Sequence, residues 1–143
     1  SLGGDERRDQ PVRQGQKTWK TYSLKDGLTE REIKSLVNVG PRIWAGGVEG
    51  TLFEYDVGAD GWKKMEPTDP LKNGGIQSIV VTKEKVFICR DNGVSVFDVP
   101  TREWESLTTS DGLLSNTIFC GAEDKKSIWF GTDKGASRLL LKE

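Results

Sequence analysis

A tryptophan recurs at a nearly constant interval along this chain. Trp19, Trp62 and Trp104 are separated by 43 and 42 residues, a period typical of a repeated structural unit. Other residues recur in the same register: Asp26, Asp69 and Asp111; Leu28, Leu71 and Leu113; Ile33, Ile76 and Ile118; Trp44, Phe87 and Trp129; Gly50, Gly93 and Gly135. The chain therefore contains three copies of one unit.

Each unit alternates short apolar segments with turns. The first unit contains I-K-S-L-V, R-I-W-A-G, L-F-E-Y-D and W-K-K-M-E, which favour four antiparallel strands. Glycine turns at 49–51, 91–93 and 133–135 suit tight hairpins. Residues 23–34 are the strongest helical candidate, but we expect a loop because Gly27 would weaken a helix interior by about 1 kcal/mol.

This pattern predicts an all-β chain of three four-stranded antiparallel β-propeller blades, at residues 28–66, 71–108 and 113–141. Residues 17–143 form the propeller domain, and the polar residues 1–16 are expected to be a flexible leader. The central aromatic residues, and the tryptophans that define the repeat, are interpreted as core.

The two ends of the repeat region are complementary. Residues 17–22, K-T-W-K-T-Y, have the pattern of a fourth strand without its own blade, whereas the third unit stops after its third strand. Propellers usually have about four to eight blades, so three cannot close a ring. We expect a homodimer in which a second chain completes a six-bladed ring and the N-terminal strands are exchanged. The alternative is a fragment of a longer propeller protein.

Charge and hydropathy exclude several kinds of partner. The 21 basic and 22 acidic residues nearly cancel, and the pI is about 5.6, so nucleic acid is not an expected partner. No apolar run reaches the roughly 18 residues that a membrane-spanning helix needs.

The residues needed for common catalytic and metal sites are missing. The chain has no histidine, which excludes Ser-His-Asp and Cys-His catalysis and histidine-based metal sites. Asp91-Asn92-Gly93 begins like a calcium loop but lacks the remaining ligands. Cys89 and Cys120 lie in apolar segments and are expected to be buried thiols. We expect a protein that is not an enzyme and uses no metal or cofactor.

Residues 111–139 resemble the two-component regulator propeller repeat through D-G-L, S-N-T-I, I-W-F-G-T and the glycine turn. The first copy has Glu30-Arg31 in place of Ser-Asn, and the second has Phe87 in place of tryptophan and Asp69-Pro70-Leu71 in place of D-G-L. The resemblance covers residues 17–143. It implies a periplasmic or extracellular sensor region of a bacterial two-component system, a class in which some members recognise carbohydrate fragments.

In a propeller, the loops between blades and the turns between second and third strands share one face. Here that face would collect Arg31, Glu32, Glu49, Asn73, Asp91, Asn92, Asn116, Asp133 and Lys134. We interpret these residues as candidates for binding a carbohydrate or protein ligand. The alternative is that they only form turns and a charged surface, because turns select asparagine, aspartate and glycine. A second alternative function is a structural module that pairs with other blades.

Overall fold

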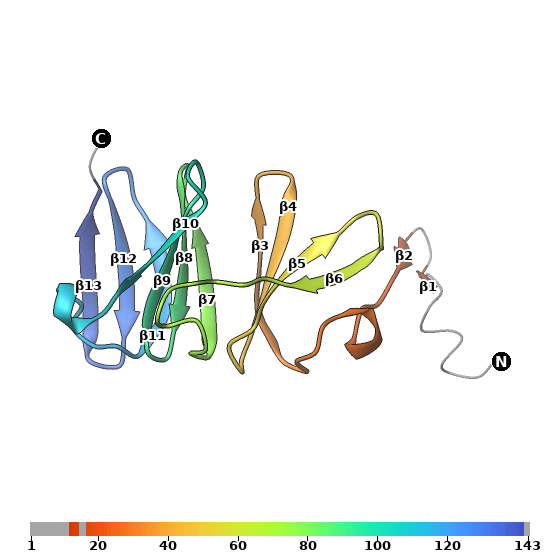
Figure 1. Cartoon of the computed structure of the whole chain (residues 1–143), viewed down its shortest axis with the longest axis horizontal. Helices are drawn as coiled ribbons and strands as arrows, with labels where there is room; N and C mark the ends of the chain where they lie inside the picture. The colour runs from red at the N-terminus through yellow and green to blue at the C-terminus, as the bar shows by residue number, and fades with distance from the viewer. Residues whose placement is uncertain (1–11, 15–16, 142–143) are drawn as a thin grey trace.

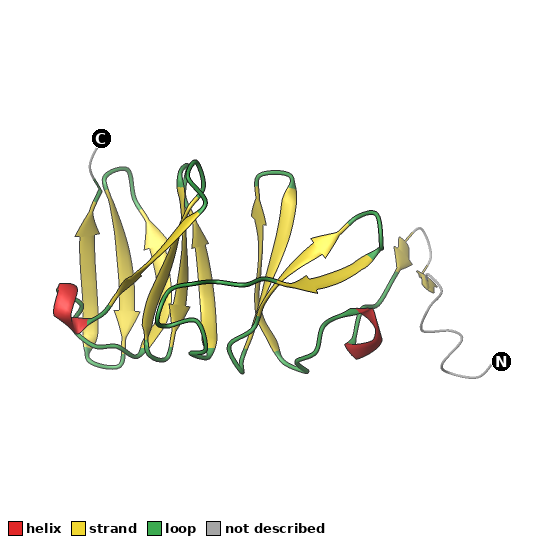
Figure 2. Cartoon of the chain, viewed as in Figure 1, coloured by secondary structure: helices red, strands yellow, loops and turns green. Residues whose placement is uncertain are grey.

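The computed structural model describes residues 12–14 and 17–141. Its strands are β1 (Val12–Gln14), β2 (Lys17–Trp19), β3 (Ile33–Val39), β4 (Arg42–Gly47), β5 (Leu52–Asp56), β6 (Gly61–Lys64), β7 (Ile76–Val81), β8 (Lys85–Arg90), β9 (Gly93–Asp98), β10 (Glu103–Leu107), β11 (Ile118–Glu123), β12 (Ser127–Thr132) and β13 (Gly135–Leu140). The only helices in the described part of the chain are two short 3-10 turns, η1 (Leu24–Asp26) and η2 (Thr109–Asp111) (Figure 2).

Strands β3 to β13 form three antiparallel sheets, each built from strands that follow one another in the chain, and β1 and β2 form a separate two-stranded sheet. The first sheet is β3-β4-β5-β6, the second is β7-β8-β9-β10, and the third is β11-β12-β13. They stand side by side in sequence order, with β13 at one end of the row and β2 at the other (Figure 1). This all-β arrangement is consistent with propeller blades, and among the described residues the third sheet has no fourth strand.

Aromatic side chains fill the space between neighbouring sheets. Trp44 of the first sheet lies 5.3 Å from Phe97 and 6.5 Å from Trp104 of the second, between ring centroids. Phe87 of the second sheet lies 5.8 Å from Phe130 of the third. Apolar burial at these two junctions therefore joins the sheets.

The third repeated aromatic residue is not in the core. Trp129 is 42% exposed, whereas Trp44 and Phe87, at the same repeat position, are 2% and 1% exposed. The physical reason is that this position faces the next sheet, and no described sheet follows the third. The indole Nε1 of Trp129 donates to Asp124 (2.8 Å), and the guanidinium of Arg138 lies 5.1 Å from the ring centroid.

The repeated aspartates have two different roles. Asp26 and Asp111 close the 3-10 turns, where they accept hydrogen bonds from the backbone N–H of Ser23 and Thr108 (2.8 and 3.0 Å). Asp69 instead is buried and accepts a hydrogen bond from Ser95 Oγ (2.7 Å). The expected loop after residue 22 is thus a loop that contains one 3-10 turn.

The N-terminal segment differs from the sequence prediction. Only residues 17–19 of the predicted strand 17–22 are extended, and β2 pairs with β1 rather than with a blade. The predicted flexible leader thus contains a strand at 12–14, while residues 1–11 and 15–16 lie outside the described part. An open strand edge takes the nearest available backbone partner, which here is the adjoining segment.

The two cysteines differ in exposure. Cys89 is buried, and burial raises the pKa of its thiol to about 12. Cys120 is exposed, which contradicts the expectation that both thiols are buried. Its strand, β11, belongs to the last sheet of the row, so no described sheet covers the outer side.

Candidate functional site

All nine predicted ligand-binding residues lie in the connections at one edge of the three sheets. This edge holds the turns β4–β5, β8–β9 and β12–β13, together with the segments that lead into β3, β7 and β11 (Figure 1). We call it the loop face. The alternating direction of the strands brings these segments, far apart in sequence, to the same edge.

Glu30 fastens the first part of the loop face. It is 5% exposed, and its carboxylate accepts hydrogen bonds from the backbone N–H of Glu49 (2.5 Å) and Thr51 (2.6 Å). A Cβ at Gly47 would overlap this carboxylate, so the glycine leaves the space that Glu30 needs. Sequence reasoning noted Glu30 only as a departure from the repeat and did not assign it this role.

A buried polar network fastens the junction between the first and second sheets. Arg90 Nη1 donates to the carbonyl oxygens of Gly50 (3.0 Å) and Gly74 (2.6 Å), and its Nε donates to Ser95 Oγ (2.7 Å). Ser95 Oγ in turn donates to Asp69. Arg90 is fully buried, and burial lowers the pKa of its guanidinium. The sequence signal for this network is an arginine that ends an apolar strand where the other copies have Gly47 and Thr132.

Several predicted ligand residues already have partners inside the chain. Asp91 accepts a hydrogen bond from Gly75 N–H (3.1 Å), and Asp133 accepts one from Ser115 Oγ (2.6 Å). Asn116 Oδ1 accepts one from Thr109 N–H (2.8 Å). These side chains hold the loops together, as the turn-forming alternative expected.

The other members of the predicted set differ in how open they are. Arg31, Glu32, Glu49, Asn73 and Lys134 are exposed, and no side-chain bond ties them to the rest of the described chain. Asn92 is half-buried, and its side chain fills the space beside Gly74, where a Cβ would overlap it. The five open side chains are the better candidates for contact with a ligand.

A polar cavity of about 300 Å³ lies at the loop face, between the β4–β5 turn of the first sheet and the segment that connects β6 to β7. Glu49 and Asn73 line it together with Lys64, Glu66 and Lys72. Sequence reasoning missed these last three, because Lys64 and Glu66 belong to W-K-K-M-E, the predicted fourth strand of the first unit, and Lys72 lies in the charged segment that leads into β7. Hydroxyl groups or charged groups of a ligand would find both donors and acceptors here.

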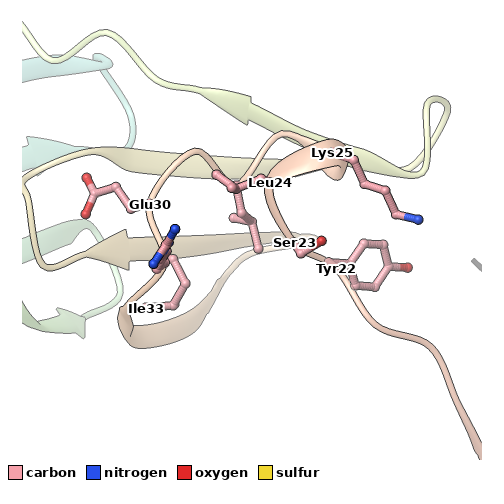
Figure 3. Close-up of a pocket in the computed structure, with 8 residues that line it drawn as sticks. Tyr22, Ser23, Leu24, Lys25, Glu30 and Ile33 are labelled. Atoms are coloured by element: carbon pink, nitrogen blue, oxygen red, sulfur yellow. The ribbon is translucent and has the colours of Figure 1, made fainter. Parts of the chain in front are cut away.

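A second cavity, of about 450 Å³, lies on the outer side of the first sheet. Tyr22, Ser23, Leu24, Lys25, Glu30 and Ile33 surround it (Figure 3). This side faces away from the second sheet, so the cavity belongs to the open end of the row.

Neither cavity has the groups of a metal centre. No cluster of three or more histidine, cysteine, aspartate or glutamate side chains occurs within residues 17–141. In the same part of the chain, no helix is long and apolar enough to cross a membrane.

The chain is similar to parts of sensor proteins. It is 29% identical over 128 residues to histidine kinase P4 of Formosa agariphila, covering 80% of this chain and 9% of that protein. It also superposes on the extracellular domain of the putative one-component system BT4673 from B. thetaiotaomicron, with a TM-score of 0.64, 25% identity, and 78% and 16% of the two chains covered. A second structure of that domain is described as part of a putative hybrid two-component system. No protein-family model matches the chain.

A designed protein has a similar fold. The computationally designed Ika4 protein matches with a TM-score of 0.57 and 17% identity, over 78% of this chain and 68% of Ika4. The chain spans only a small part of the natural proteins named above. The comparisons therefore show that the chain is similar to β-sheet units in the extracellular regions of sensor proteins.

Proposed function

We propose that this chain is a non-enzymatic binding unit of a sensor β-propeller, located in the periplasm or outside the cell. The observation that carries the proposal is the gathering of nine polar loop residues on one face of a fold similar to the extracellular domain of BT4673. A sensor needs a surface that binds and releases a ligand. The charged side chains and Asn73 around the 300 Å³ cavity are exposed, so a ligand can reach them.

The proposed ligand is a carbohydrate fragment, which would contact Asn73 and Lys72 through its hydroxyl groups. These side chains are exposed, and the same cavity wall also carries the carboxylates of Glu49 and Glu66. A carbohydrate offers both donors and acceptors, so a wall of mixed charge suits it better than it suits an anion or an apolar molecule.

The test is binding of the purified chain to an array of immobilised oligosaccharides. Asn73→Ala and Lys72→Ala should each weaken the strongest signal about 10-fold. Lys125→Ala, in the turn before β12 at the opposite edge, is the matched control and should bind as the parent chain does. Equal signals from all of these variants would rule out the cavity, and an array without signal would rule out the carbohydrate ligand.

We also propose that a second copy closes the ring into six blades. The support is the exposure of Trp19 and Trp129, which lie at opposite ends of the row of sheets and belong to positions buried or half-buried elsewhere in the repeat. A second candidate function, a structural module that pairs with a different propeller chain, has the same support. Co-purification of such a chain in place of a self-associated dimer would favour it.

A further inference from the structure

The third sheet has an unfilled groove along its edge strand, β13. The groove has a volume of about 170 Å³ and is lined by Leu107, Gly112, Leu113, Phe130, Ser137 and Leu139, among others. Its position next to β13 is the position that β6 and β10 take beside β5 and β9 in the other two sheets.

The first sheet shows what belongs in such a groove. There, Trp62 of the fourth strand packs against Leu28, Ala45 and Phe53. Leu113 and Phe130 occupy the positions of Leu28 and Ala45 in the third sheet, and Ser137 occupies that of Phe53, because it pairs with Phe130 as Phe53 pairs with Ala45. The larger Phe130 compensates for the smaller Ser137, so the groove keeps the same kind of tryptophan site.

The space beside two equivalent glycines, Gly27 and Gly112, shows where the third sheet lacks a fourth strand. A Cβ at Gly27 would overlap the carbonyl oxygen of Trp62, because the fourth strand passes directly over this turn. At Gly112, the same position of the third sheet, a Cβ would meet nothing within 4 Å. The space that a fourth strand takes in the first sheet is thus open in the third.

Residues 17–22 are in the register of a fourth strand. The turn that follows them has backbone hydrogen bonds of 2.9, 3.2 and 3.3 Å, from Asp26, Gly27 and Leu28, and the turn after β10 has the same three bonds with the same lengths. Trp19 therefore corresponds to Trp62 and Trp104. Its side chain is 58% exposed, and the described strands leave one edge of β2 unpaired.

The N-terminal segment also lies where a fourth strand of a preceding blade would lie. The ring of Tyr22 is 5.9 Å from Tyr55 and 6.4 Å from Trp62 of the first sheet. Tyr22 lies three residues after Trp19, and Met65 lies three residues after Trp62. Met65 likewise packs against the apolar cluster between the first and second sheets, as Trp104 also does. The third sheet of a second copy, β11-β12-β13, would supply the first three strands of that preceding blade.

We infer that β2 of a second copy of this chain lies antiparallel to β13, with Trp19 of the partner in the groove opposite Leu139. The pairing of β9 with β10 fixes the register, because Phe97 lies opposite Trp104 and Asp98 opposite Glu103. Thr18 of the partner then lies opposite Leu140, and Thr21 opposite Ser137. This inference rests on the proposed six-bladed ring and defines its contact.

The remaining surfaces of this contact fit the same arrangement. Trp129 would cover Tyr55 and Trp62 of the partner, as Trp44 covers Phe97 and Trp104 within the chain. The register also sets Lys20 opposite Arg138, a pair of like charges. Each is already paired with an aspartate of its own chain, Lys20 with Asp60 and Arg138 with Asp124 (3.8 Å).

The chain's own β2 lies too far from β13 to fill this groove, and in the proposed contact the second copy supplies the strand. β2 and β13 lie at opposite ends of the row of sheets (Figure 1), and propellers usually close with about four blades or more. Two copies related by a two-fold axis fill both grooves at once.

The experiment is disulfide cross-linking in the full chain with the exposed Cys120 replaced by serine. Thr18→Cys combined with Leu140→Cys should give a disulfide-linked dimer of about twice the chain mass. The matched control combines Thr18→Cys with Ala136→Cys. Its two residues would be displaced by four positions along the strand, about 13 Å, beyond the reach of a disulfide. Light scattering on each sample, before oxidation, reports the mass independently.

Each outcome has one meaning. A dimer that cross-links only in the predicted register supports the inference. A dimer that cross-links in neither variant overturns the strand pairing but keeps the ring. A monomer, or a disulfide within one chain, overturns both. Sugar binding on the array is a separate readout, so the sensing proposal can fail or survive independently of these results.

A substitution tests the groove without cysteines. Trp19→Ala should raise the dissociation constant of the dimer at least 10-fold, because it removes the side chain that fills the groove. It should leave the fold of one chain intact, since Trp19 is mostly exposed there. Leu24→Ala, at a neighbouring apolar residue that is 53% exposed and outside the groove, is the control. Equal dissociation constants for the two variants would overturn the inference.

Discussion

One repeat position carries three different side chains, and each does something different. Glu30 binds two backbone N–H groups in the first sheet, and Ser115 donates to Asp133 in the third. Asn73 of the second sheet is exposed and lines the polar cavity. In the second sheet, Arg90 holds the loop instead, because its guanidinium donates to the carbonyl oxygen of Gly74, next to Asn73.

Arg90 is the residue whose loss should be most costly at the loop face. Arg90→Ala should lower the free energy of unfolding by about 3 kcal/mol or more, because it leaves the carbonyl oxygens of Gly50 and Gly74 without this buried donor and leaves buried Asp69 without the opposite charge of the guanidinium. Arg42→Ala, which removes an ion pair with Glu54 in which the Arg42 side chain is 62% exposed, should cost less than about 1 kcal/mol. Urea unfolding of both variants checks this, and similar losses would contradict the proposed role of the network.

Asp60 should make the attachment of the N-terminal segment sensitive to acid. Its carboxylate pairs with Lys20 and accepts hydrogen bonds from the hydroxyls of Tyr55 (2.6 Å) and Tyr22 (2.8 Å). These three contacts, the one with Lys20 above all, hold the pKa of Asp60 well below its usual range. A lowered pKa in the folded state means that this stabilisation is present above about pH 4 and is lost as the pH falls.

The variant Asp60→Asn isolates this effect. Its denaturation midpoint should lie below that of the parent chain at pH 7, and the difference should shrink as the pH is lowered from 5 toward 2. Urea titrations across this range measure it. A difference that stays constant or grows in acid would show that the Asp60 carboxylate does not hold the segment.

At the scale of elements, the same turn is used at both ends of the chain. Gly27 and Gly112 follow η1 and η2 with φ of 100° and 118°, a region that other residues rarely adopt. They differ in what lies above them, since the backbone of Trp62 passes over Gly27 and the space above Gly112 is open.

This difference predicts unequal effects of alanine. Gly112→Ala should cost about 1–2 kcal/mol of stability from the strained φ alone. Gly27→Ala should cost clearly more, because the added methyl group also displaces β6. Thermal unfolding compares the two, and equal costs would contradict the described path of β6. In the proposed dimer, Gly112→Ala should in addition weaken association, because the partner's fourth strand would pass over it.

At the scale of the whole molecule, two open ends dominate the behaviour of the chain. One end exposes Trp129, and the other exposes Leu36, which is 61% accessible although Ile79, at the same repeat position, is 6% accessible. Apolar positions that the repeat buries elsewhere are thus left uncovered at both ends. Surfaces of this kind are associated with assembly.

The mass of the chain in solution tests how the ends are covered. We expect a dimer by light scattering, and deletion of residues 1–22 should convert it into a monomer or an aggregate, because both grooves lose their strand. Deletion of residues 1–16, the matched control, keeps residues 17–22 and should remain dimeric. A stable monomer of the full chain would contradict the six-bladed ring.

The sequence by itself determined the repeat, the all-β class and the loop face. These follow from local rules: alternation places side chains on a strand, and glycine and aspartate set its turns, as at Gly50 and Asp111. The tertiary structure decided which equivalent residues have equivalent surroundings. Trp44 is buried and Trp129 exposed because burial depends on the neighbouring sheet, and Arg90 fastens loops through carbonyl oxygens that only folding brings together. A repeat specifies its own strands, but position in the row decides what each strand contacts.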